Sequence, residues 1–322
     1  MKHGEKILVM GLGPAGGIFA AHLAASGYRV YGVDPWQEHI FAIVRNGLKI
    51  TNFTAFETRL EEVVFHVDQL QEKVFDYVVI AVKTPRTPEV LPVLKSLPGE
   101  FKIIVLQNGL DNEEYVAEFF ARDRILRMAV NYAGNIESPS VIRMNFFQEP
   151  NRVGCICNAK NCSHAVEIAD MMTTAALDTV AAADIREFTW KKAILNAILA
   201  PIAAILGVNM ADVMADTGTR YIVESLIRES IAVAGAAGYD YGHDFFDRCV
   251  NFLLKAGKHK PSMLIDLENG NPTEIDYING KIAEYGRKFN IPAPFNATMA
   301  ALVKAKENHN LNNHSNFNRR EK

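Results

Sequence analysis

The first half of the chain alternates short apolar runs with stretches of helical spacing. Apolar runs of strand length occupy residues 6–10, 29–33, 75–82, 102–107 and 124–132, and helical stretches occupy 18–26, 87–97 and 112–121. This alternation predicts βαβ units, and hence a parallel sheet with right-handed crossovers. Two more runs, 141–147 and 152–157, are split by Glu149, Pro150 and Asn151 and predict an antiparallel addition to that sheet.

The pattern changes near residue 184. From there the strand signal fades, and helical periodicity dominates in residues 185–206, 219–237, 245–255 and 274–289. We therefore predict an α/β protein, with an N-terminal Rossmann-type parallel sheet followed by an all-helical C-terminal domain. The expected bounds are 1–183 for the first domain and 184–306 for the second. Residues 307–322 are rich in Asn, Lys, Arg and His, and we expect a disordered tail there.

Length and charge narrow the class of protein. A chain of 322 residues exceeds the size at which one hydrophobic core usually grows, so two domains are expected. The net charge of -3 gives no basic surface for nucleic acid, and no run approaches the roughly 18 apolar residues that span a bilayer. The N-terminus leads into a predicted strand without a signal-peptide pattern. We expect a cytoplasmic protein without nucleic-acid or membrane partners.

Four cysteines are too few for a disulfide framework in a chain of this length. Cys155, Cys157, Cys162 and His164 cluster in the sequence, which raises the alternative of a metal site. Their spacing differs from paired Cys-x-x-Cys motifs, and the strand-like alternation puts Cys155 and Cys157 on one face. We favour free cysteines acting as small buried apolar side chains, with no metal, and Ser163 as the N-cap of the next helix.

A glycine-rich turn follows the first predicted strand and opens the first predicted helix. Gly11 permits the tight turn, Gly13 lets the backbone approach a pyrophosphate, and Gly16 allows close packing of the helix on the sheet. The N–H groups and dipole of a helix N-terminus favour an anion there. Residues 11–16, which also include Leu12, Pro14 and Ala15, therefore predict that the first domain binds a dinucleotide.

Asp34 stands at the end of the second predicted strand. A carboxylate at this place accepts hydrogen bonds from the ribose 2′-hydroxyl of NAD and repels the 2′-phosphate of NADP. We therefore favour NADH. The alternative is that Asp34 only caps a turn before Pro35.

Further motifs follow the glycine turn in a fixed order and give a family resemblance. With that turn, the chain resembles the ketopantoate reductase (2-dehydropantoate 2-reductase) family in Asn108-Gly109, in Trp190-Lys191-Lys192 with Asn196, in Ser262 and in Glu274. The resemblance covers nearly the whole chain and implies an oxidoreductase. Family members commonly carry an arginine near the position of Asp34 and resemble NADPH enzymes, so NADPH stays open as the cofactor.

The resemblance implies that Lys192 is the catalytic lysine, which protonates the ketone oxygen as hydride arrives. Lys192 and Asn196 lie one turn apart on a helix among apolar residues, and partial desolvation of an ammonium there would tune it for proton donation. Lys191 is turned about 100° away on the helix and is expected to be a solvated surface charge. The alternative is that both lysines are surface groups.

Other roles also follow from the resemblance. Glu274 is the active-site glutamate that hydrogen-bonds the new hydroxyl, and Ser262 grips the substrate carboxylate. Asn196 binds substrate oxygens, and Asn108 and Lys83 lie near the nicotinamide at the carboxyl edge of the sheet. The alternatives are that Ser262 and Glu274 are helix caps and that Asn108 begins a turn.

One departure bears on the substrate. Family members that act on ketopantoate carry a second asparagine one turn after the position of Asn196, where this chain has Ala200 followed by Pro201. Alanine cannot donate a hydrogen bond to a far hydroxyl. We expect reduction of a 2-oxo acid to an R 2-hydroxy acid, with ketopantoate first and a branched or apolar 2-oxo acid as the competitor. A non-catalytic NADH sensor is an alternative of another class, and the long apolar helices are compatible with a homodimer.

Overall fold

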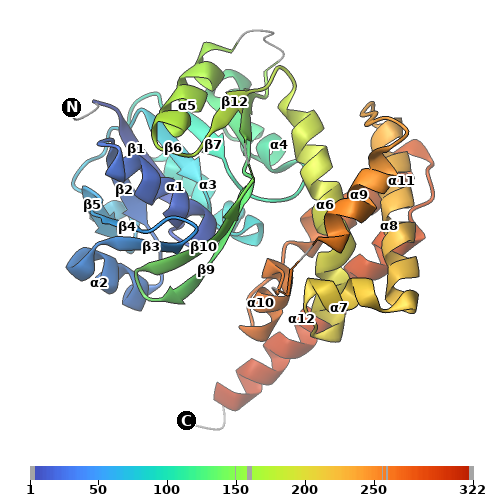
Figure 1. Cartoon of the computed structure of the whole chain (residues 1–322). Coiled ribbons are helices and arrows are strands. Elements are labelled where there is room, and N and C mark those ends of the chain that lie inside the picture. Colours follow the sequence, from blue (N-terminus) through green and yellow to red (C-terminus); the bar gives the residue numbers. More distant parts are fainter. Residues whose placement is uncertain (1–3, 149, 158–161, 256, 259, 319–322) are drawn as a thin grey trace. The chain divides into compact units, whose positions relative to one another are not determined.

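A computed structural model describes residues 4–148, 150–157, 162–255, 257–258 and 260–318. The chain divides into two compact units (Figure 1). Unit 1 contains Met1–Gln107 and Asp111–Phe188, and unit 2 contains Asn108–Leu110 and Thr189–Lys322. The expected boundary at residue 184 lies next to the start of helix α6 at Ile185. The short segment Asn108–Leu110, which we expected in the first domain, belongs to unit 2.

Unit 1 is built on an eight-stranded sheet of order β12-β11-β8-β7-β6-β1-β2-β5. Its strands are parallel except for β11, which runs antiparallel to β8, so the predicted Rossmann-type sheet is confirmed. The central strands are buried on both faces because helices cover each side. The strands are β1 (Lys6–Met10), β2 (Arg29–Val33), β5 (Glu62–Val64), β6 (Tyr77–Ile80), β7 (Lys102–Val105), β8 (Ile125–Ala129), β11 (Asn151–Cys155) and β12 (Thr179–Ala181).

A second sheet of four strands has the order β4-β3-β10-β9. Its strands are β3 (Leu48–Asn52), β4 (Phe56–Thr58), β9 (Tyr132–Ser138) and β10 (Val141–Phe147). The prediction that residues 141–147 extend the main sheet is therefore wrong, because β10 pairs with β3 and β9 instead. The other predicted addition, β11, does join the main sheet.

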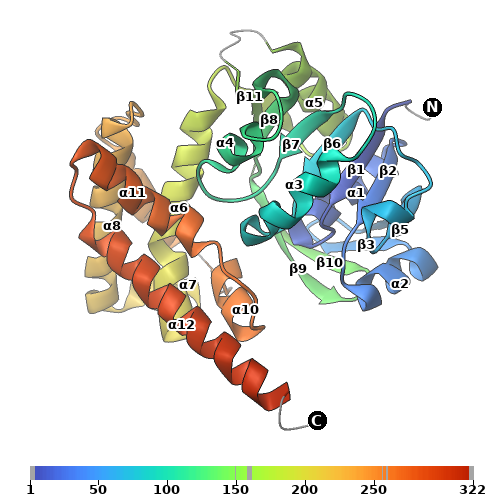
Figure 2. The ribbon, with the colours of Figure 1, turned by 180° about the vertical axis from the view of Figure 1, so that it is seen from behind.

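Helices cover both faces of the main sheet. Helix α1 (Pro14–Ala25) packs against the second sheet and shares a hydrophobic core with both sheets and with α5 (Ser163–Thr174). On the opposite face lie α3 (Thr87–Lys95) and α4 (Asn112–Ala117), which stand in front of the sheet in Figure 2. Helix α2 (Gln37–Asn46) and the short helices η1 (Val67–Gln69), η2 (Thr84–Arg86) and η3 (Arg122–Arg124) complete unit 1.

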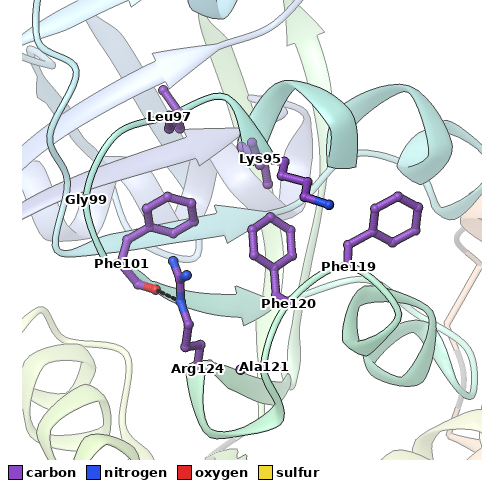
Figure 3. A pocket seen from close by; sticks show the side chains of 9 residues that line it. Lys95, Leu97, Gly99, Phe101, Phe119, Phe120, Ala121 and Arg124 are labelled. Atoms are coloured by element: carbon purple, nitrogen blue, oxygen red, sulfur yellow. Dashed lines mark hydrogen bonds between the residues drawn. The ribbon is translucent and has the colours of Figure 1, made fainter.

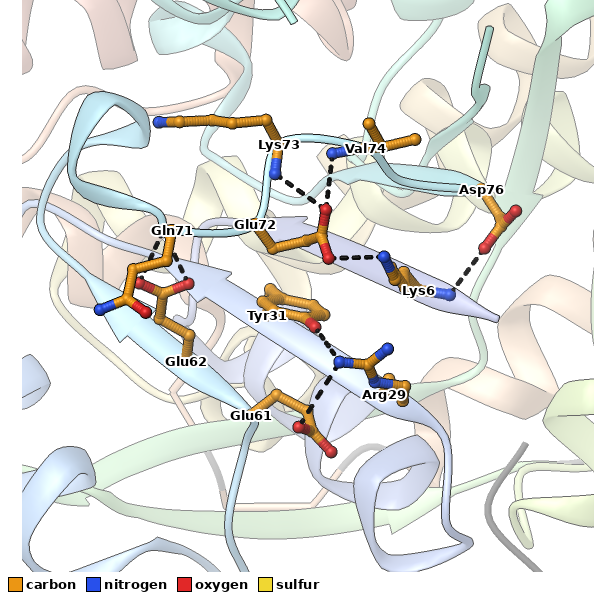
Figure 4. A network of polar contacts seen from close by, with 10 residues as sticks. All are labelled: Lys6, Arg29, Tyr31, Glu61, Glu62, Gln71, Glu72, Lys73, Val74 and Asp76. Carbon is orange, nitrogen blue, oxygen red and sulfur yellow. Dashed lines mark hydrogen bonds and ion pairs between the residues drawn. The ribbon is translucent and has the colours of Figure 1, made fainter. Parts of the chain in front are cut away.

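Ion pairs and hydrogen bonds hold the first residues of β1 and β2 (Figure 4). Lys6 donates from Nζ to Glu72, whose other oxygen accepts the backbone N–H groups of Lys73 and Val74. The Lys6 hydrogen bond, with those amides, lowers the pKa of Glu72 to about 2. Beside it, Arg29 donates to the Tyr31 hydroxyl and approaches Glu61. These contacts lie at the amino end of the strands, away from the edge where ligands bind in such sheets.

The described residues of unit 2 form helices joined by loops, without a strand, and helix α6 enters this unit at Thr189. Its elements are α6 (Ile185–Leu206), α7 (Met210–Ala215), α8 (Thr217–Ala236), α9 (Phe245–Leu254), α10 (Ser262–Glu268), η4 (Ile275–Tyr277), α11 (Asn279–Phe289) and α12 (Pro294–Asn318). Side-chain caps define two helix starts, since Asn209 accepts from the Asp212 N–H and Asp216 accepts from the Thr219 N–H. The helix predicted over 274–289 begins only at Asn279, because a 3₁₀ turn precedes it.

Helix α6 forms the core of unit 2. Its bounds agree with those expected, and Ala193, Ile194, Ala197 and Ile198 are almost fully buried. It is also the one described helix that is long and apolar enough to cross a membrane, with a mean hydropathy of 1.3 over its 18-residue window. We had not expected a segment of this kind. Because 67% of the window is buried inside the protein, its apolar surface is explained by the core.

Three predictions, about the C-terminal tail, the cysteines and the N-cap of α5, are wrong. Helix α12 continues to Asn318, so the expected disordered tail from residue 307 is helical that far, and residues 319–322 lie outside the described part. Cys155 and Cys162 form a disulfide, with Cα atoms 6.1 Å apart, while Cys157 is free and half-buried. The α5 N-cap is Cys162, one residue before the expected Ser163.

One ion pair is buried inside unit 1. Glu113 on α4 and Arg127 on β8 approach to 3.3 Å between Oε2 and Nε, with side chains only 4% and 2% exposed. Arg127 also donates from Nη1 to the Val105 carbonyl. Burial raises the pKa of Glu113, and the Arg127 cation opposes that rise. The pair fixes α4 to the sheet directly after the segment that leaves for unit 2.

Removing the Glu113 charge should therefore destabilise the fold. Glu113→Gln leaves Arg127 buried without this counter-charge, and we expect the free energy of unfolding to fall by about 3 kcal/mol. The control is Glu89→Gln, which breaks the exposed Arg86–Glu89 pair and should cost less than about 0.5 kcal/mol. Urea titration followed by circular dichroism measures both, and equal losses would contradict the expectation.

Candidate active site

The three glycines of the turn between β1 and α1 differ in whether the fold itself requires glycine there. Gly11 has φ +97°, and a Cβ atom there would lie 2.8 Å from the Val82 backbone nitrogen. A Cβ on Gly16 would collide with the Gly11 carbonyl oxygen. A Cβ on Gly13, in contrast, would meet no atom of the chain within 4 Å, and φ -62° there is open to any residue. The fold requires glycine at 11 and 16, whereas it leaves the space beside Gly13 open.

The start of α1 suits a phosphate. Gly13 is the N-cap, and Pro14 occupies the first turn, where its missing N–H costs no helical hydrogen bond. The first N–H groups of a helix have no partner within the helix, and here no acidic side chain lies in the first turn to compete for them. Together with the open space at Gly13, these residues fit the pyrophosphate of a dinucleotide.

Asp34 connects the end of β2 to the glycine turn. Its Oδ2 accepts the Leu12 N–H at 2.8 Å, and its Oδ1 accepts the Trp36 N–H at 3.0 Å. The second contact is the turn role that we had weighed as an alternative. Each carboxylate oxygen can accept a further hydrogen bond, so a role toward a ribose is compatible with both contacts.

Lys83 lies just after β6, which ends at Ile80, two residues earlier than expected. It is half-buried and is the N-cap residue of helix η2. Beside it, Gln107 donates from Nε2 to the Val82 carbonyl and the Thr87 hydroxyl, at 2.8 Å each. These bonds fix the loops at the carboxyl ends of β6 and β7, the edge at which open α/β sheets bind ligands.

In unit 2, the structure brings together two predicted residues that are far apart in the sequence. Asn108 donates from Nδ2 to Oε2 of Glu274 at 3.2 Å, and Glu274 is only 6% exposed. The Leu110 N–H donates to the Tyr277 carbonyl at 2.9 Å, and a Cβ on Gly109 would lie 2.7 Å from the same oxygen. Glycine at 109, with φ +95°, therefore lets the Asn108 segment pack directly against the Glu274 segment.

Helix α6 carries the predicted lysine and amide. Lys192 and Asn196 are half-buried one turn apart, while Lys191 is exposed, as expected from its angle on the helix. Ala200, one turn further on, is 9% exposed. The helix thus presents an ammonium and an amide along one face with an apolar position after them.

A hydrogen bond fixes α6 to the segment that follows Glu274. Pro201 has no N–H, so the Ala197 carbonyl, four residues earlier, lacks its helical donor. Asn279, fully buried at the start of α11, donates from Nδ2 to that carbonyl at 2.9 Å. Asn279 also donates to Asn296, which in turn donates to Glu229. The hydrogen bond that Pro201 removes from α6 is therefore replaced by one that links α6 to α11.

Glu307 on α12 holds Thr273, the residue before Glu274. Its Oε2 accepts both the N–H and the hydroxyl of Thr273, at 2.9 and 2.7 Å, and Lys304 pairs with it at 2.9 Å. Burial raises the pKa of Glu307, but the Lys304 and Thr273 donors outweigh it and leave that pKa lowered. Sequence reasoning missed Glu307 and Asn279, because nothing local marks a buried polar residue whose partners lie far along the chain.

Ser262 is the first residue of α10 and is exposed. The helix is capped by Pro261 without a side-chain hydrogen bond, so the alternative of Ser262 as a cap is wrong. The side chain of Glu274 likewise makes no capping hydrogen bond. In the described part of the chain, no group of three or more His, Cys, Asp or Glu residues is placed to hold a metal ion.

A separate pocket of about 210 Å³ lies in unit 1 (Figure 3). It is lined mainly by Leu94, Leu97, Phe101, Phe119 and Phe120, with Arg124 stacked on two of these rings. Phe101 and Arg124 come directly before β7 and β8, so the pocket is at the amino edge of the sheet. None of the predicted site residues lines it.

Two family models match the chain in the order of its units. The model described as ketopantoate reductase PanE/ApbA matches residues 7–157, and the C-terminal model of the same family matches residues 184–307. The chain belongs to the ketopantoate reductase family of NAD(P)-binding oxidoreductases. The matched ranges include Gly11–Gly16, Asp34, Lys83 and Asn108 in the first model, and Lys192, Asn196, Ser262 and Glu274 in the second.

Relatives cover almost the whole chain at modest identity. The 2-dehydropantoate 2-reductase of Pyrococcus abyssi is 29% identical over 304 residues, which is 94% of this chain and 98% of that protein. The ternary structure of D-mandelate dehydrogenase with NADH and anilino(oxo)acetate is 26% identical, with TM-score 0.86 over 95% of this chain and 99% of that one. The 2-dehydropantoate 2-reductase of Geobacter metallireducens GS-15 is also 26% identical, with TM-score 0.84 over 93% and 99%.

A substitution at Gly13 tests whether glycine is needed there for ligand binding, since the fold leaves room for a side chain. In Gly13→Ala the new methyl group meets no atom of the chain, so the melting temperature should fall by no more than a few degrees, the cost of alanine at a helix N-cap. If the pyrophosphate approaches Gly13, the methyl group should weaken NADH binding at least tenfold, or by about 1.4 kcal/mol. Fluorescence titration measures the dissociation constant.

The matched control is Gly235→Ala, in helix α8, where a Cβ also meets nothing within 4 Å. It should leave the NADH affinity unchanged. Wild-type affinity in Gly13→Ala would show that no ligand occupies the space beside Gly13.

Proposed function

We propose that this member of the ketopantoate reductase family reduces a 2-oxo acid to the R 2-hydroxy acid, with ketopantoate as the substrate and pantoate as the product. The observation that carries the proposal is the contact of Asn108 with the buried Glu274 inside unit 2. Burying a carboxylate is costly, and this one, 6% exposed and held by an amide from a distant segment, is the glutamate that the family resemblance assigns to the active site.

When bound, a reduced nicotinamide supplies a hydride to the carbonyl carbon of the substrate. Residues of the chain supply the proton that the ketone oxygen needs. Lys192, half-buried on α6, donates a proton to the ketone oxygen as that oxygen gains negative charge. A cation at this position also stabilises the developing alkoxide before the proton moves.

Glu274 accepts a hydrogen bond from the hydroxyl that forms. The Asn108 amide holds one of its oxygens, and Glu307 holds the preceding Thr273, so the carboxylate is positioned before substrate arrives. Asn196, one turn after Lys192, donates to substrate oxygens, and the exposed Ser262 hydroxyl serves the substrate carboxylate. Lys83, at the carboxyl edge of the sheet, serves the cofactor side of the site.

A second substrate has specific support. Ala200 occupies the position where ketopantoate reductases carry an asparagine, and its side chain is almost buried and apolar. Among similar structures is the D-mandelate dehydrogenase with NADH and anilino(oxo)acetate. A branched or aromatic 2-oxo acid is therefore the competing substrate. A non-catalytic NADH sensor is not favoured, because Lys192, Glu274 and the family match support chemistry.

For the cofactor we propose NADH. Asp34 is partly exposed at the end of β2 and carries a negative charge where a 2′-phosphate would bind. The NADH named for the D-mandelate dehydrogenase structures agrees with this choice. NADPH, the cofactor that the family resemblance implies, is the alternative.

The function is tested by turnover with and without Lys192. Wild-type protein should consume NADH with ketopantoate, 2-oxoisovalerate or phenylglyoxylate, and the preferred acid identifies the substrate. In Lys192→Ala, kcat should fall by roughly 10² to 10⁴, the usual contribution of a general acid.

Lys191→Ala is the matched control, since it removes an exposed lysine from the adjacent position. It should keep wild-type turnover. The proposal fails if Lys192→Ala and Lys191→Ala turn over every acid equally, or if the wild type reduces none of them.

The charge of Asp34 leads to a prediction about which cofactor binds more tightly. In Asp34→Asn one side-chain oxygen remains for the Leu12 or Trp36 N–H, but the charge is gone. The ratio of NADPH to NADH affinity should rise roughly tenfold, because each 1.4 kcal/mol of removed repulsion is worth that factor. Titration with both cofactors measures it, and tighter NADPH binding by wild type would overturn the choice of NADH.

A further inference from the structure

His39 on α2 is fully buried and contacts three parts of unit 1. Its Nε2 lies 3.0 Å from the Leu12 carbonyl oxygen in the glycine turn, and the Ser140 N–H lies 3.2 Å from its Nδ1. Its ring also stacks on the Trp36 indole, with centroids 5.1 Å apart and planes 6° apart. The family models and the motif order give this histidine no role.

The two hydrogen bonds determine which ring nitrogen carries the proton. The Ser140 backbone N–H can only donate, so Nδ1 must accept and be unprotonated. Nε2 therefore carries the proton and donates it to the Leu12 carbonyl. The ring is neutral, with both nitrogens used.

The contact with Leu12 determines the direction of the next N–H group. The Leu12 carbonyl and the Gly13 N–H belong to one planar trans peptide, so they point in opposite directions. His39 holds the carbonyl on one side, while Asp34 holds the Leu12 N–H in the preceding peptide at 2.8 Å. The Gly13 N–H is thereby directed away from His39.

The other partner, Ser140, lies in the turn between β9 and β10 of the second sheet. It has φ +65°, a left-handed conformation that is unfavourable for serine, and it is 3% exposed. Its carbonyl accepts the Lys49 N–H at 2.9 Å, and its N–H donates to His39. These two bonds offset the backbone strain and set where His39 is held.

We infer that His39 is a positioning residue for dinucleotide binding, which aims the Gly13 N–H at the pyrophosphate and rests on the Ser140 turn. The inference depends on the proposed dinucleotide site. The inference gives the second sheet a role in binding, because its Ser140 turn holds His39 and His39 orients the glycine turn.

The same geometry makes binding sensitive to acid. Protonation would put a hydrogen on Nδ1 against the Ser140 N–H, so the two donors would repel. Burial lowers the pKa of His39, while the Leu12 contact and the Asp34 charge raise it in part. Its two hydrogen-bond partners, the Leu12 carbonyl and the Ser140 N–H, are backbone groups that do not titrate. The neutral ring is therefore kept at neutral pH, and it gains a proton only at a pH below the ordinary histidine pKa.

Two amide variants separate the two bonds. In His39→Gln the side-chain nitrogen can reach the Leu12 carbonyl, as Nε2 does, whereas in His39→Asn the shorter side chain reaches only toward Ser140. We expect NADH affinity within about threefold of wild type for His39→Gln and at least tenfold weaker for His39→Asn, by fluorescence titration at pH 7.5. Melting temperatures of the two variants show whether they are equally folded.

The pH profile gives a readout that a merely structural role would not move. The wild-type dissociation constant for NADH should rise severalfold between pH 7 and pH 5, and the rise should be absent in His39→Gln. Equal affinities of His39→Asn and wild type overturn the inference, as do parallel pH profiles of wild type and His39→Gln. A wild type that binds neither NADH nor NADPH overturns the proposed function together with it.

Discussion

The candidate active site depends on a carbonyl that a proline leaves without its helical donor. Pro201 removes the hydrogen bond that the Ala197 oxygen would receive in an unbroken helix, and the buried Asn279 amide supplies one instead. An unpaired buried carbonyl costs about 1–3 kcal/mol, so the two segments are held together by the need to satisfy it. Lys192 and Asn196 are on one of these segments, and Glu274 comes shortly before the other. The chemistry proposed here needs those groups at a fixed spacing, and this bond restrains it.

The two units hold their candidate functional groups in place by different means. Unit 1 forms its candidate phosphate site from backbone, where glycines remove side chains and Asp34 and His39 hold the peptide groups of Leu12. Unit 2 forms its candidate catalytic groups from side chains, which are held by buried amides and carboxylates such as Asn279 and Glu307. A backbone site suits phosphate, which any oriented N–H can bind, whereas proton transfer needs groups with particular acidities.

Much of this could be predicted from the sequence, and the failures have physical causes. The central strands and α6 were predictable because an element that is buried on most sides consists largely of apolar residues, which are visible in the sequence. The second sheet was not, although its strand at 141–147 was predicted with the observed bounds, because the pattern of a strand does not reveal which strands it pairs with. Glu274 was expected in a helix because the apolar period of α11 extends backwards through a 3₁₀ turn. Helix α12 was missed because its polar C-terminal part has the composition of a tail, while Glu307 is buried by partners that no local pattern reveals. The candidate residues came from the order of family motifs, and the Asn108–Glu274 contact is what the structure adds.

The three residues Asn108–Leu110 have a consequence for modularity. They are encoded within the nucleotide-binding half, yet they pack as part of the helical half. A gene fragment that begins at residue 189 would therefore specify a helical body with one of its own pieces missing, and Glu274 would lose its amide neighbour. Recombination that exchanged whole halves between distant homologues would pair each Glu274 segment with a foreign tripeptide. Residues 108–110 and the Glu274 segment must therefore stay compatible with each other as the chain evolves.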